Sequence, residues 1–425
     1  MNEHDSEKIA GSLKAEGFVE AVAEEDADLI VLNTCSIREK AEQKFYSEVG
    51  KFRKQKEENP SLIIAVSGCI AQQEGIKILR RAPHVNFIFG NQNITELPGL
   101  IAGAGSRKPR ALTEFGTGYE HALLPVERES PVKAFVNIMY GCDNFCSYCV
   151  VPYVRGREKS RRPDDIVREI ETLVSHGCRE VTLLGQNVNS YGRGLDGAGM
   201  DFPGLLRMVD GIDGLLRIRF VTSHPKDLSG PLIDAMASLP KVCKNLHLPV
   251  QSASDRVLAA MNRGYTFADY MSKLDRLKAA MPDITLSTDI IVGFPGETEE
   301  DYELTVDALA DIAYDSIFSF KYSRRPNTKA LKLPDHIPED VKAARLDRII
   351  NMQNEITTRK NEARAGMVEE VLVEGPDKSG VTGRLMGKSR GGNTVNFAGD
   401  ASLVGKVVRV RITEGKKHSL VGEPL

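Results

Sequence analysis

The sequence predicts an α/β protein in which an open parallel sheet, a parallel βα barrel and a small antiparallel β-barrel follow one another. Short apolar runs alternate with helical stretches over residues 1–98 and again over 132–364, a pattern typical of parallel sheets covered by helices. Residues 365–425 change to short runs of β-forming residues, which favour a small barrel. Residues 99–131 carry Gly, Pro and mixed charge, and we expect a linker there.

The composition is that of a globular protein: of 425 residues, 41% are hydrophobic and 27% are charged. This length allows two or three domains at ~150 residues each. The sequence has no run of ~18 apolar residues, and its polar start lacks the features of a signal peptide, so we expect a cytoplasmic chain without a membrane partner. Because the net charge is −3, contact with nucleic acid would need local basic patches.

The first domain is expected to have strands over 28–32, 62–66 and 86–89, with helices over 6–16, 38–56 and 72–80. Cys35 and Cys69 each follow a strand by three residues, at the sheet edge where α/β proteins bind ligands. The seven cysteines are an odd number, which argues against a disulfide framework. Metal binding and ordinary buried cysteines both remain open for this pair.

The second domain is expected to form a full or partial barrel of parallel strands. Its strands are predicted over 134–139, 180–184, 217–221, 245–248, 285–291 and 316–320. Helices are expected between them, for example over 163–176 and 298–309, and a polar amphipathic helix follows over 338–364.

The strongest chemical signal is the motif Cys142-Asp-Asn-Phe-Cys146-Ser-Tyr-Cys149, which follows the first barrel strand. Three thiolates within eight residues can hold a four-iron cluster and leave one iron open for a ligand. Zinc is the competing interpretation, but a structural zinc site needs a fourth ligand. His121 and His224 are the candidates for that ligand, and their spacing does not favour either.

Further motifs resemble the methylthiotransferase family of radical S-adenosylmethionine (SAM) enzymes over essentially the whole chain. They are the cysteine motif with its continuation to Arg161, Gly185-Gln-Asn-Val-Asn-Ser-Tyr191, Thr222-Ser-His-Pro225, His247-Leu-Pro-Val-Gln-Ser252, Ser287-Thr-Asp-Ile-Ile-Val-Gly-Phe-Pro-Gly-Glu-Thr298, Tyr322-Ser-Arg-Arg-Pro326, Asn33-Thr-Cys-Ser-Ile-Arg38 and Gly68-Cys-Ile-Ala-Gln72. The residues of the first two motifs are most similar to those of the branch that modifies tRNA.

This resemblance implies that Cys142, Cys146 and Cys149 hold a 4Fe–4S cluster whose open iron binds SAM. It also implies a second 4Fe–4S cluster in the N-terminal domain, held in part by Cys35 and Cys69, as the source of sulfur. The implied reaction is methylthiolation of C2 of an N6-isopentenyladenosine in the tRNA anticodon loop, with flavodoxin or ferredoxin as electron donor and a monomeric enzyme. A radical is needed because the aromatic C2–H bond is not acidic.

The chain departs from the family pattern at its start. It begins at Met1, just after the place where the family has the first strand of the sheet and the first of three cluster cysteines. We expect a wrongly assigned start or a fragment rather than a natural variant with two cysteines. Alternative functions are methylthiolation of ribosomal protein S12 or of another tRNA adenosine, a shortened enzyme that only cleaves SAM, and an RNA-binding protein with structural zinc.

Five residues at the predicted strand ends or beside the cysteines are expected to contact SAM: Tyr148, Gly185, Gln186, Gln251 and Asp289. Each could equally be a polar residue of the barrel core. The last 60 residues resemble a TRAM domain, a module of RNA-modifying enzymes, and two basic runs are expected to contact RNA phosphates: Arg155, Arg157 and Arg161 beside the cysteines, and Arg384, Lys388 and Arg390 in the barrel. Solvated surface charge is the alternative for both runs.

Overall fold

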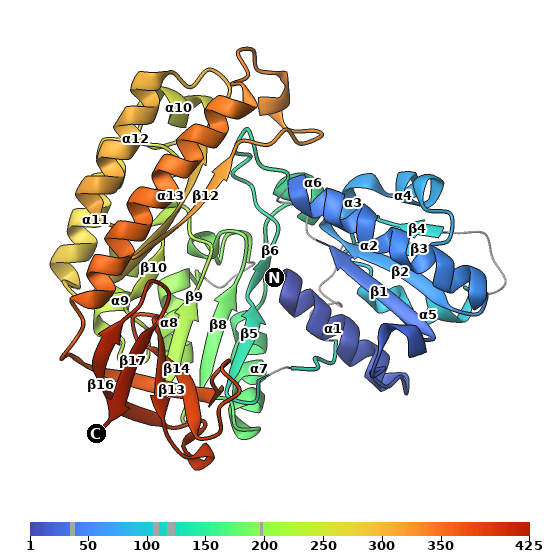
Figure 1. Ribbon diagram of the computed structural model, residues 1–425, viewed down its shortest axis with the longest axis horizontal. Helices are drawn as coiled ribbons and strands as arrows, with labels where there is room; N and C mark the ends of the chain where they lie inside the picture. Colours follow the sequence, from blue (N-terminus) through green and yellow to red (C-terminus); the bar gives the residue numbers. More distant parts are fainter. Residues whose placement is uncertain (35–38, 105–109, 117–123, 129, 196–198) are drawn as a thin grey trace. The chain divides into compact units, whose positions relative to one another are not determined.

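The computed structural model describes residues 1–34, 39–104, 110–116, 124–128, 130–195 and 199–425, and it divides into two compact units (Figure 1). The first unit contains Met1–Glu129, Tyr140–Asp143 and Val150–Glu158. The second unit contains Ser130–Met139, Asn144–Cys149 and Lys159–Leu425.

The first unit is a four-stranded parallel sheet in the order β1 (Leu29–Thr34), β2 (Ile63–Gly68), β3 (Phe87–Phe89) and β4 (Arg110–Leu112). Its helices are α1 (Asn2–Ala15), α2 (Glu39–Glu58), α3 (Cys69–Glu74), α4 (Ile76–Arg81), α5 (Leu97–Ala102) and α6 (Val151–Arg155). The predicted parallel sheet is confirmed. The stretch expected to be a linker contributes β4, because three extended residues are enough to pair with β3.

Both faces of this sheet are covered by helices. On one face, Phe45 and Phe52 of α2 and Ile78 of α4 pack with Ile64 of β2. On the other face, Ile9 of α1 packs with β2 and β3 and with α5. The helix expected over 72–80 is divided into α3 and α4 at Gly75, whose φ of 50° interrupts the helical backbone.

The second unit contains six parallel strands in two groups of three. The first group is β5 (Lys133–Asn137), β8 (Glu180–Leu184) and β9 (Arg217–Phe220), and the second is β10 (Asn245–His247), β11 (Thr285–Val292) and β12 (Ser316–Lys321). A parallel bridge between Ile218 and Val242 joins the end of the first group to the approach to β10. This arrangement confirms the predicted partial βα barrel.

Helices cover the outside of these strands: α7 (Pro163–Ser175), α8 (Phe202–Asp210), α9 (Gly230–Ser238), α10 (Asp255–Ala260), α11 (Phe267–Ala280), α12 (Glu299–Ile312) and α13 (Glu339–Glu362). Ile166 and Ile170 of α7 and Leu205 of α8 are fully buried against the apolar faces of the strands. A short pair, β6 (Met139–Tyr140) and β7 (Lys159–Ser160), flanks the cysteine motif.

The C-terminal residues form a closed five-stranded barrel in the order β13 (Val368–Pro376), β14 (Arg384–Ser389), β15 (Thr394–Ala398), β17 (Leu420–Pro424) and β16 (Val407–Gly415). Val371, Phe397 and Val410 fill its core. All pairs are antiparallel except β15 and β17, which run parallel, so the expectation of a wholly antiparallel barrel is corrected at one pair.

The barrel contacts the amino ends of the parallel strands through two buried arginines of β9 (Figure 1). Arg217 Nη2 donates to the Glu370 carbonyl at 2.7 Å, and Arg219 Nη2 donates to the Ser389 carbonyl at 2.6 Å. The Arg219 charge is neutralised by Glu180, whose carboxylate lies 3.0 Å from Nε. The barrel therefore occupies the amino edge of the strands and leaves the carboxyl edge for ligands.

Candidate functional site

The three motif cysteines lie on one loop between β6 and α6. At the start of this loop, Gly141 has φ 71°, and a Cβ there would lie 2.0 Å from the Arg157 carbonyl oxygen. Only glycine fits this close approach. The Cys142 N–H donates to the Gly156 carbonyl at 3.2 Å, which fixes the entry into the loop.

The middle of the loop is held by the segment that follows α10. Ser147 donates through its N–H to Met261 and through its hydroxyl to Ala260, at 2.9 and 2.8 Å. The side-chain amide of Asn262 donates to the carbonyls of Asn144 and Phe145. Because Phe145 has φ 46°, its strained conformation needs such external support.

The Cys146 thiol lies close to two side chains that come from other parts of the second unit. Arg263 Nη1 lies 3.4 Å from Cys146 Sγ and 3.4 Å from the Tyr148 hydroxyl. His224 Nε2 lies 3.9 Å from the same sulfur, and its ring packs edge-on against Tyr265. Burial raises the pKa of the Tyr148 hydroxyl, which the Arg263 charge opposes, and the neighbouring cysteines raise the pKa further.

His224 is held as a neutral imidazole. Burial lowers its pKa to about 2, and the charges of Arg263, Lys226 and Lys273 act in the same direction. Its backbone N–H donates to the Asn187 side chain at 3.1 Å, so the loop after β8 and the loop after β9 are joined at this point. His224 was expected only as a possible zinc ligand, and the structure brings it to the cysteine motif.

Three of the residues expected to contact SAM, Gly185, Gln186 and Gln251, follow strands, whereas Asp289 lies within one and Tyr148 in the cysteine loop. Gly185 follows β8 and is buried against Met139, where a Cβ would meet the Met139 side chain at 2.4 Å. Gln186 comes next and is partly buried. Asp289 lies within β11, where its carboxylate is 3.4 Å from His247 Nε2.

Gln251 has the features of a ligand-binding residue. Its backbone has φ 70°, and its N–H and carbonyl pair with Asp289 and Ile291 beside β11. Its side-chain oxygen is buried and has no hydrogen-bond partner among the residues that the structure describes, and the same holds for the Ser223 hydroxyl after β9. Buried polar atoms without a partner are costly, so both atoms fit a polar ligand at this edge.

The donor set of the loop fits a four-iron cluster. Among the residues that the structure describes, no three His, Cys, Asp or Glu side chains are grouped to hold a single metal ion. In an iron–sulfur cluster each thiolate binds a different iron, so the ligands need not converge on one point. Three half-buried thiols on one shaped loop meet that requirement.

Cys69 lies at the carboxyl edge of the N-terminal sheet, directly after β2, and is 6% exposed. The Asn91 side-chain amide lies 3.7 Å from its sulfur, and Val150 and Val154 pack against it. Cys35, the other expected ligand, lies outside the described residues. The structure therefore places one of the two expected ligands, the Cys69 thiol, at this edge of the sheet.

Arg155 contacts this thiol instead of lying on the surface. Its guanidinium is 7% exposed, donates to Asp5 at 2.6 Å and hydrogen-bonds the Cys69 side chain. Burial by itself would lower the pKa of Arg155, but the charges of Asp5 and Cys69 raise it overall. Sequence reasoning assigned Arg155 to RNA because a run of basic residues does not reveal which of them turns inward.

The other residues expected to contact RNA differ in exposure. Arg161 is buried and pairs with Glu169 at 2.8 Å, and the half-buried Arg390 donates to the carbonyls of Pro240 and Val242. Lys388 is half-buried and donates to the Thr394 hydroxyl. Arg157 and Arg384 are exposed enough to meet solvent, and they pair with Asp143 and Asp377.

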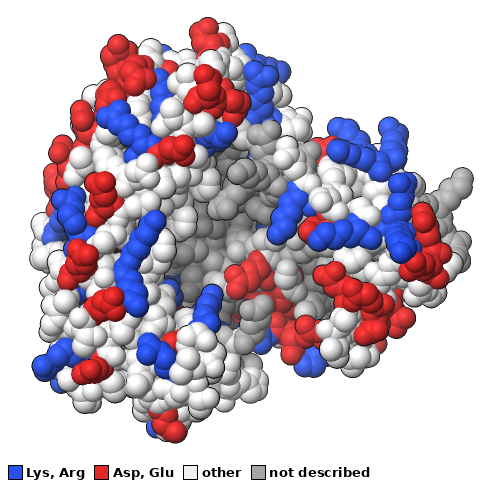
Figure 2. All heavy atoms as spheres, viewed as in Figure 1, with Lys and Arg blue, Asp and Glu red and all other residues white. Residues whose placement is uncertain are grey.

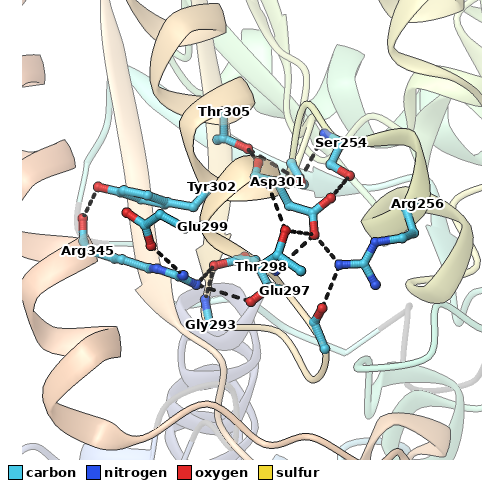
Figure 3. Close-up of polar contacts among 12 residues, drawn as sticks. Ser254, Arg256, Gly293, Glu297, Thr298, Glu299, Asp301, Tyr302, Thr305 and Arg345 are labelled. Carbon is cyan, nitrogen blue, oxygen red and sulfur yellow. Dashed lines mark hydrogen bonds and ion pairs between the residues drawn. The ribbon is translucent and has the colours of Figure 1, made fainter.

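The loop after β11 is fixed by a buried ion-pair network (Figure 3). Glu297 accepts from the Gly293 N–H at 2.9 Å and from Arg345 Nη1 of α13 at 2.6 Å. Arg345 Nη2 also binds Glu299 at 2.7 Å. Figure 3 shows these side chains converging between the start of α12 and α13, so the network holds the carboxyl end of β11 in place.

Asp301, the third residue of α12, forms a capping box with the N-cap residue Thr298, and it also accepts from Ser254 and Arg256. Burial would raise its pKa, but the hydrogen bonds from Ser254, Thr298 and Arg256 lower the pKa to about 2. Because the folded pKa is depressed, its stabilisation is present above the unfolded pKa of ~4 and is lost as the pH falls toward 2.

We therefore expect Asp301→Asn to lower the free energy of unfolding at pH 7 by about 1–3 kcal/mol and to flatten its pH dependence between pH 4 and 2. Urea unfolding of the metal-free chain over that range measures both effects. The matched control is Asp269→Asn, which removes the exposed capping box of α11 with Thr266. Equal acid sensitivity in Asp301→Asn and the parent chain would contradict the assignment.

Sequence reasoning did not find Met261-Asn-Arg-Gly264, the segment that holds the cysteine loop. Asn262 has φ 57° and Gly264 has φ 68°, so Arg263 stands between two left-handed residues that aim its side chain at the loop. In the sequence, this segment is indicated only by an Asn and a Gly on either side of an Arg after a helix, a pattern that is typical of a turn.

Charge on the outer surface follows no single sign. On the face that Figure 2 shows, basic and acidic side chains are interspersed over the second unit. Exposed ion pairs of this unit include Arg348–Glu303 and Lys321–Glu339. None of the helices in the described part of the chain is long and apolar enough to cross a membrane.

Comparison with known families identifies three segments. The chain matches the Radical SAM superfamily over residues 136–309, the uncharacterized protein family UPF0004 over residues 1–90, and the TRAM domain over residues 362–425.

Full-length relatives are also similar. A protein of Carboxydothermus hydrogenoformans named tRNA-2-methylthio-N(6)-dimethylallyladenosine synthase is 50% identical, and the match covers 99% of this chain and 96% of that protein. A protein of the same name from Clostridium novyi is 50% identical over 100% of this chain and 94% of that protein. The solved structure of the radical SAM methyltransferase TsrM from Kitasatospora setae has a TM-score of 0.57 at 15% identity, covering 86% of this chain and 74% of that one, which shows a shared fold.

Proposed function

Because this chain belongs to the tRNA-2-methylthio-N(6)-dimethylallyladenosine synthases, which are radical SAM enzymes, we propose that it attaches a methylthio group to C2 of N6-dimethylallyladenosine in tRNA. The identity of 50% over essentially the full length carries this conclusion. The three thiols of the Cys142–Cys149 loop would supply the cluster ligands that this function requires.

Within this function each group has a task. Cys142, Cys146 and Cys149 would hold a 4Fe–4S cluster, and Tyr148, Gly185, Gln186, Gln251 and Asp289 would line the SAM site. When bound, the cluster and SAM supply a radical that can remove the unreactive C2 hydrogen, which no general base could remove. The partnerless oxygen of Gln251 and the hydroxyl of Ser223 would orient polar groups of SAM by hydrogen bonds.

The second cluster is proposed at the carboxyl edge of the N-terminal sheet, with Cys69 and Cys35 among its ligands. The supporting observation is the buried Cys69 thiol with Arg155 and Asn91 around it, because such N–H donors stabilise a thiolate. A small electron carrier such as flavodoxin or ferredoxin would supply the electron that radical SAM chemistry consumes.

Contact with tRNA is proposed through the exposed members of the two basic runs. Arg157 and Arg384 have side chains that are 71% and 37% exposed, so they can exchange their carboxylate partners for phosphates. Arg155 and Arg161 are buried and paired with acidic side chains, and Arg390 is bound to two backbone carbonyls, so these three would act by holding the fold. The TRAM segment and its barrel support RNA as the partner.

The proposal is tested with the full chain, reconstituted anaerobically with iron and sulfide and supplied with SAM and dithionite. The substrate is an anticodon stem-loop carrying N6-dimethylallyladenosine, and the matched control is the same RNA with unmodified adenosine. We expect methylthiolated product from the first RNA and little from the second. Formation of 5′-deoxyadenosine without sulfur insertion in an iron-loaded protein would contradict the proposed function.

A further inference from the structure

We propose that His224 and Arg263 donate N–H groups to the Cys146 thiolate and thereby raise the reduction potential of the cluster that this thiolate holds. The inference rests on the proposed function, because that function places a cluster on this loop. It adds two positioning residues that act through a cluster ligand and do not touch the substrate.

Arg263 is fixed in the orientation that this role needs. Its Nε donates to the Tyr265 hydroxyl at 3.1 Å, and its Nη2 donates to the Pro249 carbonyl at 2.7 Å. Nη1 remains for the Cys146 sulfur and the Tyr148 hydroxyl, each 3.4 Å away. With three of its nitrogens directed in this way and 5% of the residue exposed, the guanidinium is a rigid donor.

The hydrogen bonds of His224 decide which of its nitrogens carries the proton. The backbone N–H of Lys226 donates to Nδ1 at 3.2 Å, so Nδ1 must offer its lone pair. In the neutral ring the proton is then on Nε2, the atom 3.9 Å from Cys146 Sγ. His224 therefore faces the sulfur as a donor, because a metal ligand would need a lone pair on Nε2.

The direction of the effect follows from charge. Reduction adds one electron to the cluster, and the added negative charge is shared with the sulfur ligands. Hydrogen bonds to those sulfurs and a buried positive charge stabilise the reduced form more than the oxidised form. Removal of either donor should therefore make the cluster harder to reduce, while the iron content stays the same.

The test compares the parent chain with His224→Phe, which keeps an aromatic ring beside Tyr265 and removes the N–H, and with His224→Gln, which restores an N–H donor. Each full-length protein is reconstituted anaerobically and titrated with dithionite in the presence of SAM. The reduced cluster is followed by electron paramagnetic resonance, using the signal that changes when SAM is added. His176→Phe, at an exposed helix end, is the matched control.

We expect His224→Phe to lower the equilibrium constant for reduction about tenfold, which is about 59 mV for one electron. His224→Gln should recover most of this loss, and His176→Phe should show none. An iron-loaded His224→Phe protein with an unchanged potential would overturn the inference and leave the proposed function standing. A parent chain that takes up no iron would remove both.

A second measurement needs no variant. In the reduced parent protein, electron–nuclear double resonance should detect protons coupled to the cluster that disappear when the sample is prepared in D2O, since N–H protons exchange. Detection of such protons supports the two donors. Their absence at full iron loading would overturn the inference even if His224→Phe failed to fold.

Discussion

Replacing Cys146 with alanine is expected to abolish methylthiolation and SAM cleavage. The change removes one of three thiols, and the other two, Cys142 and Cys149, are already needed as ligands of the cluster. The loss should exceed the roughly 10- to 100-fold cost that is typical when only a residue behind a metal ligand is changed. Iron and sulfide analysis should show the content of one cluster lost from the reconstituted protein.

The fold should survive this change, because the loop is held mainly by bonds from Ser147 and Asn262 rather than by the thiol. Circular dichroism checks that point. Cys178→Ala is the matched control, since Cys178 is buried in the core and its thiol donates to the Glu180 carbonyl at 3.2 Å. Full iron content in Cys146→Ala, or an equal loss in Cys178→Ala, would refute the assignment of this loop.

Replacing Arg345 with methionine is expected to destabilise the second unit by about 3–5 kcal/mol. The change leaves the Glu297 carboxylate without its cation, and that side chain is 4% exposed. Burial already raises the pKa of Glu297, against the Gly293 N–H and Arg345, which lower it. Urea unfolding of the metal-free chain at pH 7 measures the loss.

A nearby exposed pair offers the control. Arg348→Met breaks the ion pair with Glu303, in which both side chains are at least 40% exposed, and should cost no more than about 1 kcal/mol. The double change Arg345→Met with Glu297→Gln should recover part of the loss, because no buried charge remains. A loss below 1 kcal/mol in Arg345→Met would show that the network in Figure 3 contributes little to stability.

The strands were the most predictable part of the structure. Residues 62–66 are apolar throughout, as expected for a strand that is buried on both faces of a parallel sheet, and β2 appears there. Residues 285–291 mix apolar and polar side chains, and β11 appears there. Strand β4 was missed, since Arg110–Leu112 is too short to show a period. Its extended form depends on pairing with β3, which only the fold supplies.

The cysteine motif was readable because its ligands are close in sequence. The surroundings of Cys146 were not, because His224 and Arg263 are 78 and 117 residues away along the chain. The basic run beside the motif also did not reveal which of its side chains are buried. Arg155 and Arg161 turn inward to acidic partners, whereas Arg157 stays exposed. Spacing reveals which residues share a loop, whereas burial depends on tertiary packing.

The central claim is tested most directly by nucleoside mass spectrometry of tRNA. The chain is expressed in a bacterial strain that makes N6-dimethylallyladenosine but lacks its own methylthiolating enzyme. The account predicts that 2-methylthio-N6-dimethylallyladenosine appears with the parent chain and stays absent with Cys146→Ala. If the tRNA retains only N6-dimethylallyladenosine while the parent chain is folded and loaded with iron, the proposed methylthiolation by this chain is contradicted.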